Sequence, residues 1–220
     1  MKRILLLPVL ISICISLSGQ KVSKVDFDAI KKTLDTSPKL YKDLLNRFVS
    51  SDSTLTNEEF SIIYYGQCYQ EDYNPYGSDV ENFDKFKKHY LAKDYDKALP
   101  IALKMIRENP LDMKMTFKTL VCYHHLNDEA GKNNMIARYN GIMKTIFDSG
   151  DGKTDSTAFV VMCVSDEYEL MASLQVENTS QSLIGFCDVM RLKENDLGID
   201  KLYFNVSKPM ASMMDMFKKK

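Results

Sequence analysis

The sequence predicts an α+β fold, in which N-terminal helical hairpins precede a small antiparallel sheet with one or two helices. Apolar residues recur at helical spacing over most of residues 38–147, which predicts amphipathic helices. Runs rich in β-branched and apolar residues dominate the last third of the chain, which predicts strands. We therefore expect a leader over residues 1–19, a helical region over 20–150, and an α+β region over 151–220 packed on it as one compact unit.

The first twenty residues, MKRILLLPVLISICISLSGQ, have the layout of a secretory signal peptide. Two basic residues precede an apolar run of about 14 residues, shorter than the ~20 that a permanent membrane-spanning helix needs. Small residues follow the run, so we expect cleavage near Ser18 or Gly19. The mature protein is then periplasmic or extracellular, with no membrane span. Acylation of Cys14 is the alternative, which the bulky Ile13 before it disfavours.

The charge balance argues against a nucleic-acid partner. The chain has 29 Lys and Arg against 30 Asp and Glu. Removing residues 1–19 takes away two basic residues, which leaves 27 against 30 and a formal charge of −3. Nucleic-acid binding draws most of its affinity from a clustered positive excess, which this sequence lacks. Its 45% hydrophobic content is ample for a core.

Local signals place the first helices. Ser37 and Pro38 predict the start of a helix that runs to about Val49, with Ser as the cap and Pro in the first turn. Thr56 followed by Glu59 is a capping box, which opens a second helix. The sequence QEDYNPYG then ends that helix.

The segment YLAKDYDKALPIALKMIRENP resembles the second half of a tetratricopeptide repeat. Ala98 stands where the helices cross, and Pro110 ends the unit. Lys93 replaces the usual turn glycine, and Pro100 lies inside the second helix, where it should cost an amide bond and bend the axis. Another helical pair follows. Two hairpins are fewer than the ~3 repeats that a solenoid normally needs, so we expect them to lean on the C-terminal region.

The C-terminal region predicts strands with a helix between them. TAFVVMCV reads as a strand, and SDEYELMASL as a short helix with Ser165 as its cap and Asp166 and Glu167 in its first turn. At that position negative charge is favourable without any catalytic role. SLIGFCDVMRL and KLYFNVS predict an antiparallel strand pair, and PMASMMDMFKKK a final helix.

The sequence FDSGDGKT, residues 147–154, ends in the letters of a phosphate-binding loop, but the rest of that motif is missing. A P-loop needs a glycine where this chain has Phe147, and it needs a strand before the loop, where the pattern here predicts a helix. Gly150 and Gly152 are better explained as turn residues that reverse the chain into the sheet. We therefore expect no nucleotide and no other cofactor.

The cysteines and histidines do not predict a metal site. There is no C-x-x-C pair, and the neighbouring His124 and His125 point about 100° apart on a helix. Buried free thiols are the favoured interpretation of the cysteines. A disulfide between Cys163 and Cys187 is the open alternative, because export would permit one.

Five of the twelve tyrosines fall in the sixteen residues IIYYGQCYQEDYNPYG. Packing around the Asn74–Pro75 turn is the favoured explanation. A surface for a partner or a sugar is the alternative, because tyrosine combines contact area with a polar tip. The candidate binding residues are Tyr65, Tyr69, Tyr73 and Tyr76.

Three stretches together resemble the exported Bacteroidetes family catalogued as domain of unknown function 4919. They are STLTNEEFSIIYYGQCYQEDYNPYG, FDSGDGKTDSTAFVVMCVSDEYELM and CDVMRLKENDLGIDKLYFNVSKP, and the resemblance covers about residues 38–209. It implies export in a Gram-negative bacterium and helices followed by a sheet. The family pattern often has a histidine before the Glu167–Tyr168 pair, where this chain has Asp166, so no metal or acid–base role is carried over.

The leading functional hypothesis is a non-enzymatic binding module for a protein or peptide, which uses the concave side of the hairpins and the tyrosine-rich stretch. No G-x-S-x-G elbow or other catalytic constellation is present, so no catalytic residue is assigned. The rival is a small hydrolase of peptide or glycan, with four carboxylates converging where helices meet sheet. These are Asp148, Asp151, Asp166 and Glu167. A purely structural envelope protein is the third possibility.

Overall fold

The computed structural model describes residues 25–77 and 79–218. The expected leader, its cleavage site and Cys14 lie outside the described residues. No helix within the described ranges combines the length and the apolar character that crossing a bilayer requires.

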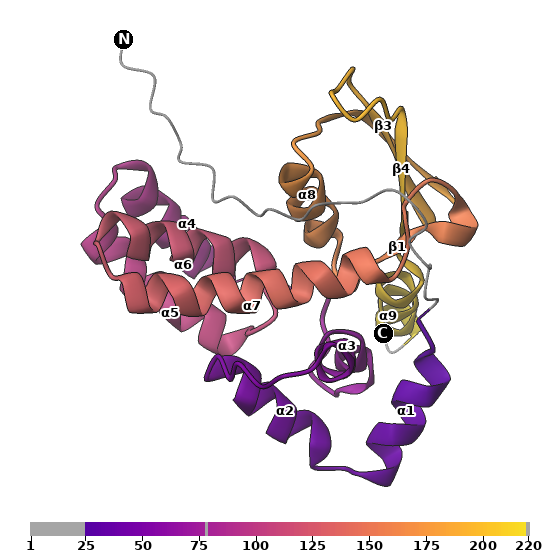
Figure 1. Ribbon diagram of the computed structural model, residues 1–220, viewed down its shortest axis with the longest axis horizontal. Helices are drawn as coiled ribbons and strands as arrows, with labels where there is room; N and C mark the ends of the chain where they lie inside the picture. The colour runs from indigo at the N-terminus through magenta and orange to yellow at the C-terminus, as the bar shows by residue number, and fades with distance from the viewer. Residues whose placement is uncertain (1–24, 78, 219–220) are drawn as a thin grey trace.

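The architecture is α+β, as the sequence predicts, with a helical N-terminal half and a small sheet near the C-terminus (Figure 1). The α-helices are α1 (Phe27–Thr36), α2 (Leu40–Val49), α3 (Asn57–Gly66), α4 (Val80–Leu91), α5 (Tyr95–Glu108), α6 (Met113–His125), α7 (Glu129–Asp148), α8 (Val164–Ser173) and α9 (Ser207–Lys218). The strands are β1 (Phe159–Val160), β2 (Asn178–Ile184), β3 (Cys187–Leu192) and β4 (Lys201–Asn205). Two short 3-10 turns lie at Gln67–Tyr69 and Asp155–Thr157.

The N-terminal helices differ from the prediction in two ways: there is an additional helix, and the start of the next one is shifted. Helix α1, which the sequence analysis missed, begins after Asp26, whose side chain accepts from the amide of Ala29 at 2.9 Å. Ser37 ends α1 and does not cap α2, which begins at Leu40. Only three residues separate α1 from α2. The Ser37–Pro38 pair fits the end of one helix as well as the start of the next, so it did not reveal α1. The Thr56 capping box at the start of α3 is confirmed.

Helices α4 to α7 form two consecutive hairpins with their own apolar core, which includes Phe86, Ala98, Met115 and Leu120. Helix α5 continues through Pro100 to Glu108. The twenty-residue α7 then runs from the hairpins to the sheet (Figure 1), so it joins the two regions.

Lys93 lies in the left-handed region at the α4–α5 turn, with φ of 59°. The amide of the next residue, Asp94, donates to the carbonyl of His89 at 2.9 Å, which closes the end of α4. Glycine adopts this conformation without steric cost, so Lys93→Gly is expected to raise the free energy of unfolding by about 0.5 to 1 kcal/mol in urea titrations. Lys87→Gly, on the exposed face of α4, is the control and should lower it by about 1 kcal/mol. A loss of stability in both variants would contradict the explanation.

The sheet has the order β1-β4-β3-β2, so the last strand in sequence lies inside it. The antiparallel pairing of β3 with β4 is confirmed. Two expectations are wrong. β1 pairs with β4 in parallel, which makes the sheet mixed, and SLIGFCDVMRL is not one strand. It bends at Gly185, whose φ is +62°, into the β2–β3 hairpin. A glycine as the first residue of a two-residue turn favours such a hairpin.

The main core is shared by the helical region and the sheet. It joins Ile30 of α1, Ile63 of α3 and Ile142 of α7 to Met190 and Phe204 of the sheet. The hairpins therefore do rest on the C-terminal region through α7 and this common core.

The loop after α7 is a turn, as the sequence predicts. Gly152 has φ of +66°. The amides of Asp151 and Gly152 both donate to the carbonyl of Thr157, at 3.0 and 2.8 Å. Gly150 lies so close to this carbonyl that an added Cβ would sit 2.4 Å from its oxygen. The glycines of FDSGDGKT therefore shape the chain where it enters the sheet.

The four cysteines within the described ranges are free thiols. The Sγ of Cys163 donates to the carbonyl of Pro75 at 3.1 Å, and that of Cys187 to the carbonyl of Asp155 at 3.8 Å. The structure thus lacks the Cys163–Cys187 disulfide, because the two thiols bond to separate loops.

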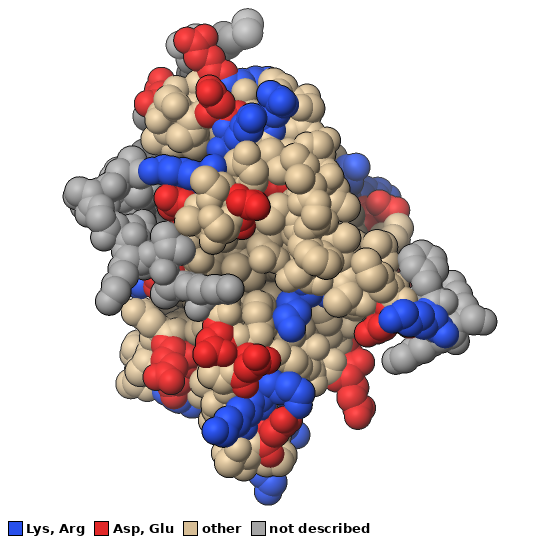
Figure 2. All heavy atoms as spheres, turned by 90° about the vertical axis from the view of Figure 1, so that its right-hand side faces the viewer, with Lys and Arg blue, Asp and Glu red and all other residues tan. Residues whose placement is uncertain are grey.

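Charges are interspersed on the face that carries the sheet, α9 and α1 (Figure 2). Lysine, arginine and acidic side chains gather towards its upper and lower ends, and a broad area with few charged side chains lies between them. Neither sign dominates this face, in keeping with the near-balanced composition.

Candidate functional site

Helix α8 carries two buried acidic side chains in its first turn. The Tyr64 hydroxyl donates to Oδ2 of Asp166 at 2.7 Å and accepts from the amide of Met162 at 3.0 Å. Burial raises the pKa of Asp166 to about 8, although the Tyr64 hydrogen bond acts in the opposite direction. This arrangement ties α3 to the segment between β1 and α8.

Glu167 is 0% exposed, and neither of its carboxyl oxygens has a hydrogen-bond partner among the described residues. Its pKa is raised to about 9, chiefly by burial and then by the neighbouring Asp188 of β3. The two carboxyls are close enough to interact electrostatically, but their oxygens do not meet hydrogen-bond geometry. Glu167 is therefore held in its protonated form at neutral pH.

A chain of hydrogen bonds links α8 to the hairpin. The hydroxyl of Tyr168 donates to Oε1 of Gln181 at 3.0 Å, and Nε2 of Gln181 donates to Oδ2 of Asp188 at 2.9 Å. Tyr168 itself is exposed. The buried acids therefore lie directly beneath a surface that α8 and β2 share.

The geometry gives these acids a structural role. A general acid must reach its substrate, and Glu167 has no exposed surface. No group of three or more His, Cys, Asp or Glu within residues 25–77 and 79–218 is placed to hold a metal ion. Asp148 and Asp151 sit in ion pairs with lysines near the surface, apart from the buried Asp166. The four carboxylates of the hydrolase hypothesis are therefore not gathered in one cleft.

The hydroxyls of two of the four candidate tyrosines donate hydrogen bonds to backbone carbonyls of other helices. Tyr65 is 2% exposed, and its hydroxyl donates to the carbonyl of Thr145 at 3.1 Å. The hydroxyl of Tyr69 donates to the carbonyl of Phe27 at 2.9 Å. Tyr65 therefore offers no surface to a partner in this structure.

The other two lie in the loop that follows α3. The hydroxyl of Tyr73 donates to the carbonyl of Met162 at 2.7 Å, which fixes the loop next to α8. Tyr76 is exposed, and Asp188 contributes to the rise of its pKa, after burial. Of the four, Tyr76 is best placed for a partner, and it lies near the surface of α8 and the hairpin.

A groove of about 540 Å³ runs between the C-terminal part of α8 and the start of β2. Its lining is mostly apolar, with amide and carboxylate groups at one end. The lining residues are Tyr168, Met171, Ala172, Gln175, Val176, Glu177 and Asn178.

The strand beside the groove, β2, forms one edge of the sheet. Ile184 and Cys187 flank the two-residue turn and form a hydrogen-bonded pair, so pairs alternate from there as far as Ser180, beyond which the register shifts at Thr179. This alternation directs the backbone N–H and C=O groups of Gln181 and Leu183 away from β3. No charged residue occurs from Asn178 to Cys187, although edge strands are commonly protected by charge.

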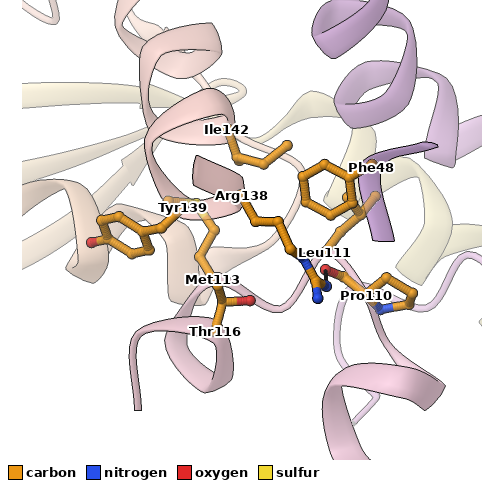
Figure 3. Close-up of a pocket in the computed structure, with 8 residues that line it drawn as sticks. All are labelled: Phe48, Pro110, Leu111, Met113, Thr116, Arg138, Tyr139 and Ile142. Atoms are coloured by element: carbon orange, nitrogen blue, oxygen red, sulfur yellow. Dashed lines mark hydrogen bonds between the residues drawn. The ribbon is translucent and has the colours of Figure 1, made fainter. Parts of the chain in front are cut away.

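A second pocket, around Arg138 of α7, has a packing role (Figure 3). Arg138 is 4% exposed and extends past the ring of Phe48 to donate to the carbonyl of Pro110 at 3.0 Å. Burial lowers its pKa to about 10, so it stays charged at neutral pH. The pocket is too small to hold a water molecule. Arg138 therefore ties the start of α6 to α7.

One family model, described as Domain of unknown function (DUF4919), matches residues 28–215. The chain therefore belongs to the DUF4919 family. This match begins within α1, ends within α9 and covers the whole sheet. No curated protein and no solved structure matches the chain.

In this DUF4919 chain, local sequence patterns predict the tyrosine loop and the acids of α8, but not the groove or the edge strand. Two signals would have found the edge. The first is Gly185 inside SLIGFCDVMRL, and the second is the uncharged run that surrounds it. The groove is lined by the continuous stretch from Tyr168 to Asn178, which carries no sequence pattern that predicts it.

Proposed function

We propose that this chain is an exported protein of the cell envelope that binds an extended segment of a polypeptide, and that it is not an enzyme. Export is supported by the leader-like run at residues 4–17 and by the family resemblance, which also favours an origin in Bacteroidetes. A kinship of the α4–α7 hairpins with tetratricopeptide repeats is part of the same proposal.

One observation carries the binding role: β2 is an uncharged strand at the edge of the sheet, paired on one side only, with a mostly apolar groove at its start. An extended segment can add to such an edge, because its backbone bonds to the free groups of the strand. On the same segment, side chains of one face would reach the groove. The mode needs no catalytic group.

The exposed tyrosines fit this proposal as contacts at its border. Tyr168 lines the groove and bonds to Gln181 of the edge strand. Tyr76 lies near Asp188, which is bonded to the same Gln181. The proposal thus moves the predicted partner surface from the concave side of the hairpins to the junction of α8 with β2. A hydrolase would need Glu167 exposed to its substrate, so we do not favour that alternative.

Peptide display tests the proposal. Random peptides selected on the mature protein are expected to be uncharged over about six residues, and to bind with micromolar affinity or better. Leu183→Pro removes an outward amide of the edge strand, and Ala172→Trp fills the groove; each should weaken binding at least tenfold. Leu197→Ser, at an exposed site in the β3–β4 loop, is the control and should bind as the wild type does. Selected peptides that bind the wild type and all three variants equally would contradict a binding site at β2 and the groove.

A further inference from the structure

We infer that the extended segment at β2 is supplied by a second copy of this chain, and that two copies pair their β2 strands antiparallel about a two-fold axis. The inference rests on the proposed function, since it uses the same edge and groove. It goes further because it names the partner.

The first reason is that the ends of β2 complement each other. At one end, the turn carries three exposed apolar side chains: Leu183 is 54%, Ile184 63% and Phe186 59% exposed. Gly185 between them has no neighbouring atom within 4 Å of an added Cβ, so the turn projects from the body. At the other end, Asn178 begins the strand and lines the apolar groove. One molecule thus carries both a projecting apolar tip and a hollow that suits it.

The second reason is that antiparallel pairing brings each tip to the other copy's groove. The tip and the groove are separated by the length of the strand, about 20 Å for seven residues. A two-fold axis at the middle of β2 reverses one strand against the other, so both tip-to-groove contacts form at once. Such an interface is isologous, because both copies contribute the same surface to it.

The free backbone groups define the register. Gln181 and Leu183 have outward N–H and C=O groups, so they form the hydrogen-bonded pairs, with Gln181 of each copy opposite Leu183 of the other. Ser182 then lies on the axis and faces its own counterpart. In this register Ile184 comes opposite Ser180, and the turn that carries Phe186 lies towards the end of β2 where Asn178 lines the groove.

The third reason is the absence of a charge that would oppose pairing. Charged residues on an edge strand oppose pairing with another strand, and a charge at the axis would meet its own equivalent in the second copy. The run Asn178–Cys187 has no charged residue, in a chain of which 27% is charged. The joined sheet would have eight strands, with neither β2 left as an edge.

Light scattering on a sizing column tests the pairing with the mature protein. The wild type is expected at twice the monomer mass at micromolar concentrations. Phe186→Asp removes the tip and should raise the dimer dissociation constant roughly thirtyfold or more. Leu197→Asp places the same charge at another exposed apolar site and should leave the dimer intact. Circular dichroism establishes that each variant is folded.

A charge exchange at the axis tests the register. Ser182→Lys alone and Ser182→Asp alone should each be mainly monomeric, because two like charges would meet. An equal mixture of the two variants should restore the dimer. A dimer that persists in Phe186→Asp and in both Ser182 variants would overturn the inference, and so would a monomeric wild type.

The results distinguish self-pairing of β2 from the binding of a foreign peptide at the same strand. A monomeric wild type that binds selected peptides at β2 would retain peptide binding and exclude self-pairing. A dimer that satisfies the charge exchange but selects no peptide would retain self-pairing and exclude foreign segments.

Discussion

The Glu167→Gln variant is expected to be more stable than the wild type by about 2 to 4 kcal/mol at pH 8, and to differ little from it at pH 5. Glu167 is fully buried without a hydrogen-bond partner, and its pKa in the folded protein is raised from 4.5 to about 9. Gln has nearly the same shape and cannot ionise. The comparison therefore isolates the cost of keeping this carboxyl in the interior.

The direction in which the free energy of unfolding changes with pH follows from proton binding by Glu167. Between about pH 4.5 and pH 9 the folded state holds a proton on Glu167 that the unfolded state has lost. Stability is therefore full below pH 4.5 and falls as the pH rises towards 9, by at most ~1.4 kcal/mol per pH unit. The buried Asp166, with a pKa raised to about 8, acts in the same direction in both proteins, so some slope will remain in the variant.

Urea unfolding at several pH values measures the effect. Glu177→Gln is the matched control, because Glu177 is exposed and paired with Lys193 at the surface. It should shift stability by less than about 0.5 kcal/mol at any of these pH values. Parallel pH profiles for the wild type and Glu167→Gln would contradict the account of Glu167.

Gly150→Ala is expected to lower the free energy of unfolding by about 2 to 4 kcal/mol. The new Cβ would meet the carbonyl oxygens of Thr157 and Ala158 at 2.4 and 2.6 Å. Both are backbone atoms, and the Thr157 oxygen already accepts from Asp151 and Gly152. The loop cannot move aside without losing those bonds, so the cost falls on the connection between α7 and the sheet.

Thermal unfolding should show a midpoint about 5 to 10 °C lower for Gly150→Ala. Gly185→Ala separates crowding from backbone conformation, because Gly185 has a positive φ but no neighbour within 4 Å. It should cost only about 1 kcal/mol. Equal losses in the two variants would show that close approach at Gly150 is not the cause.

The sequence predicted what depends on local pattern. The helical period, the Thr56 capping box, the turn glycines of FDSGDGKT and the β3–β4 pair all appear in the structure. The missed features depend on partners distant in sequence. The parallel contact of Phe159 with Phe204 joins residues 45 positions apart, and no local signal distinguishes it from antiparallel pairing.

The same limit applies to the candidate site. Asp166 and Glu167 looked like ordinary first-turn acids, since negative charge is favourable there whether or not it is exposed. Only packing against Tyr64 and β3 shows that they are buried. Tyr76 could be singled out because it lies in an unusual local composition, whereas the stretch that lines the groove, Tyr168–Asn178, has no distinctive composition.

The position of β4 between β1 and β3 bears on how the protein is made. The strand at the middle of the sheet is the last to leave the ribosome, and its Leu202 and Phe204 belong to the core shared with the earliest helices. Until those residues emerge, β1 and the β2–β3 hairpin have nothing between them. The sheet and the shared core can therefore be completed only after nearly all of the described residues have been synthesised.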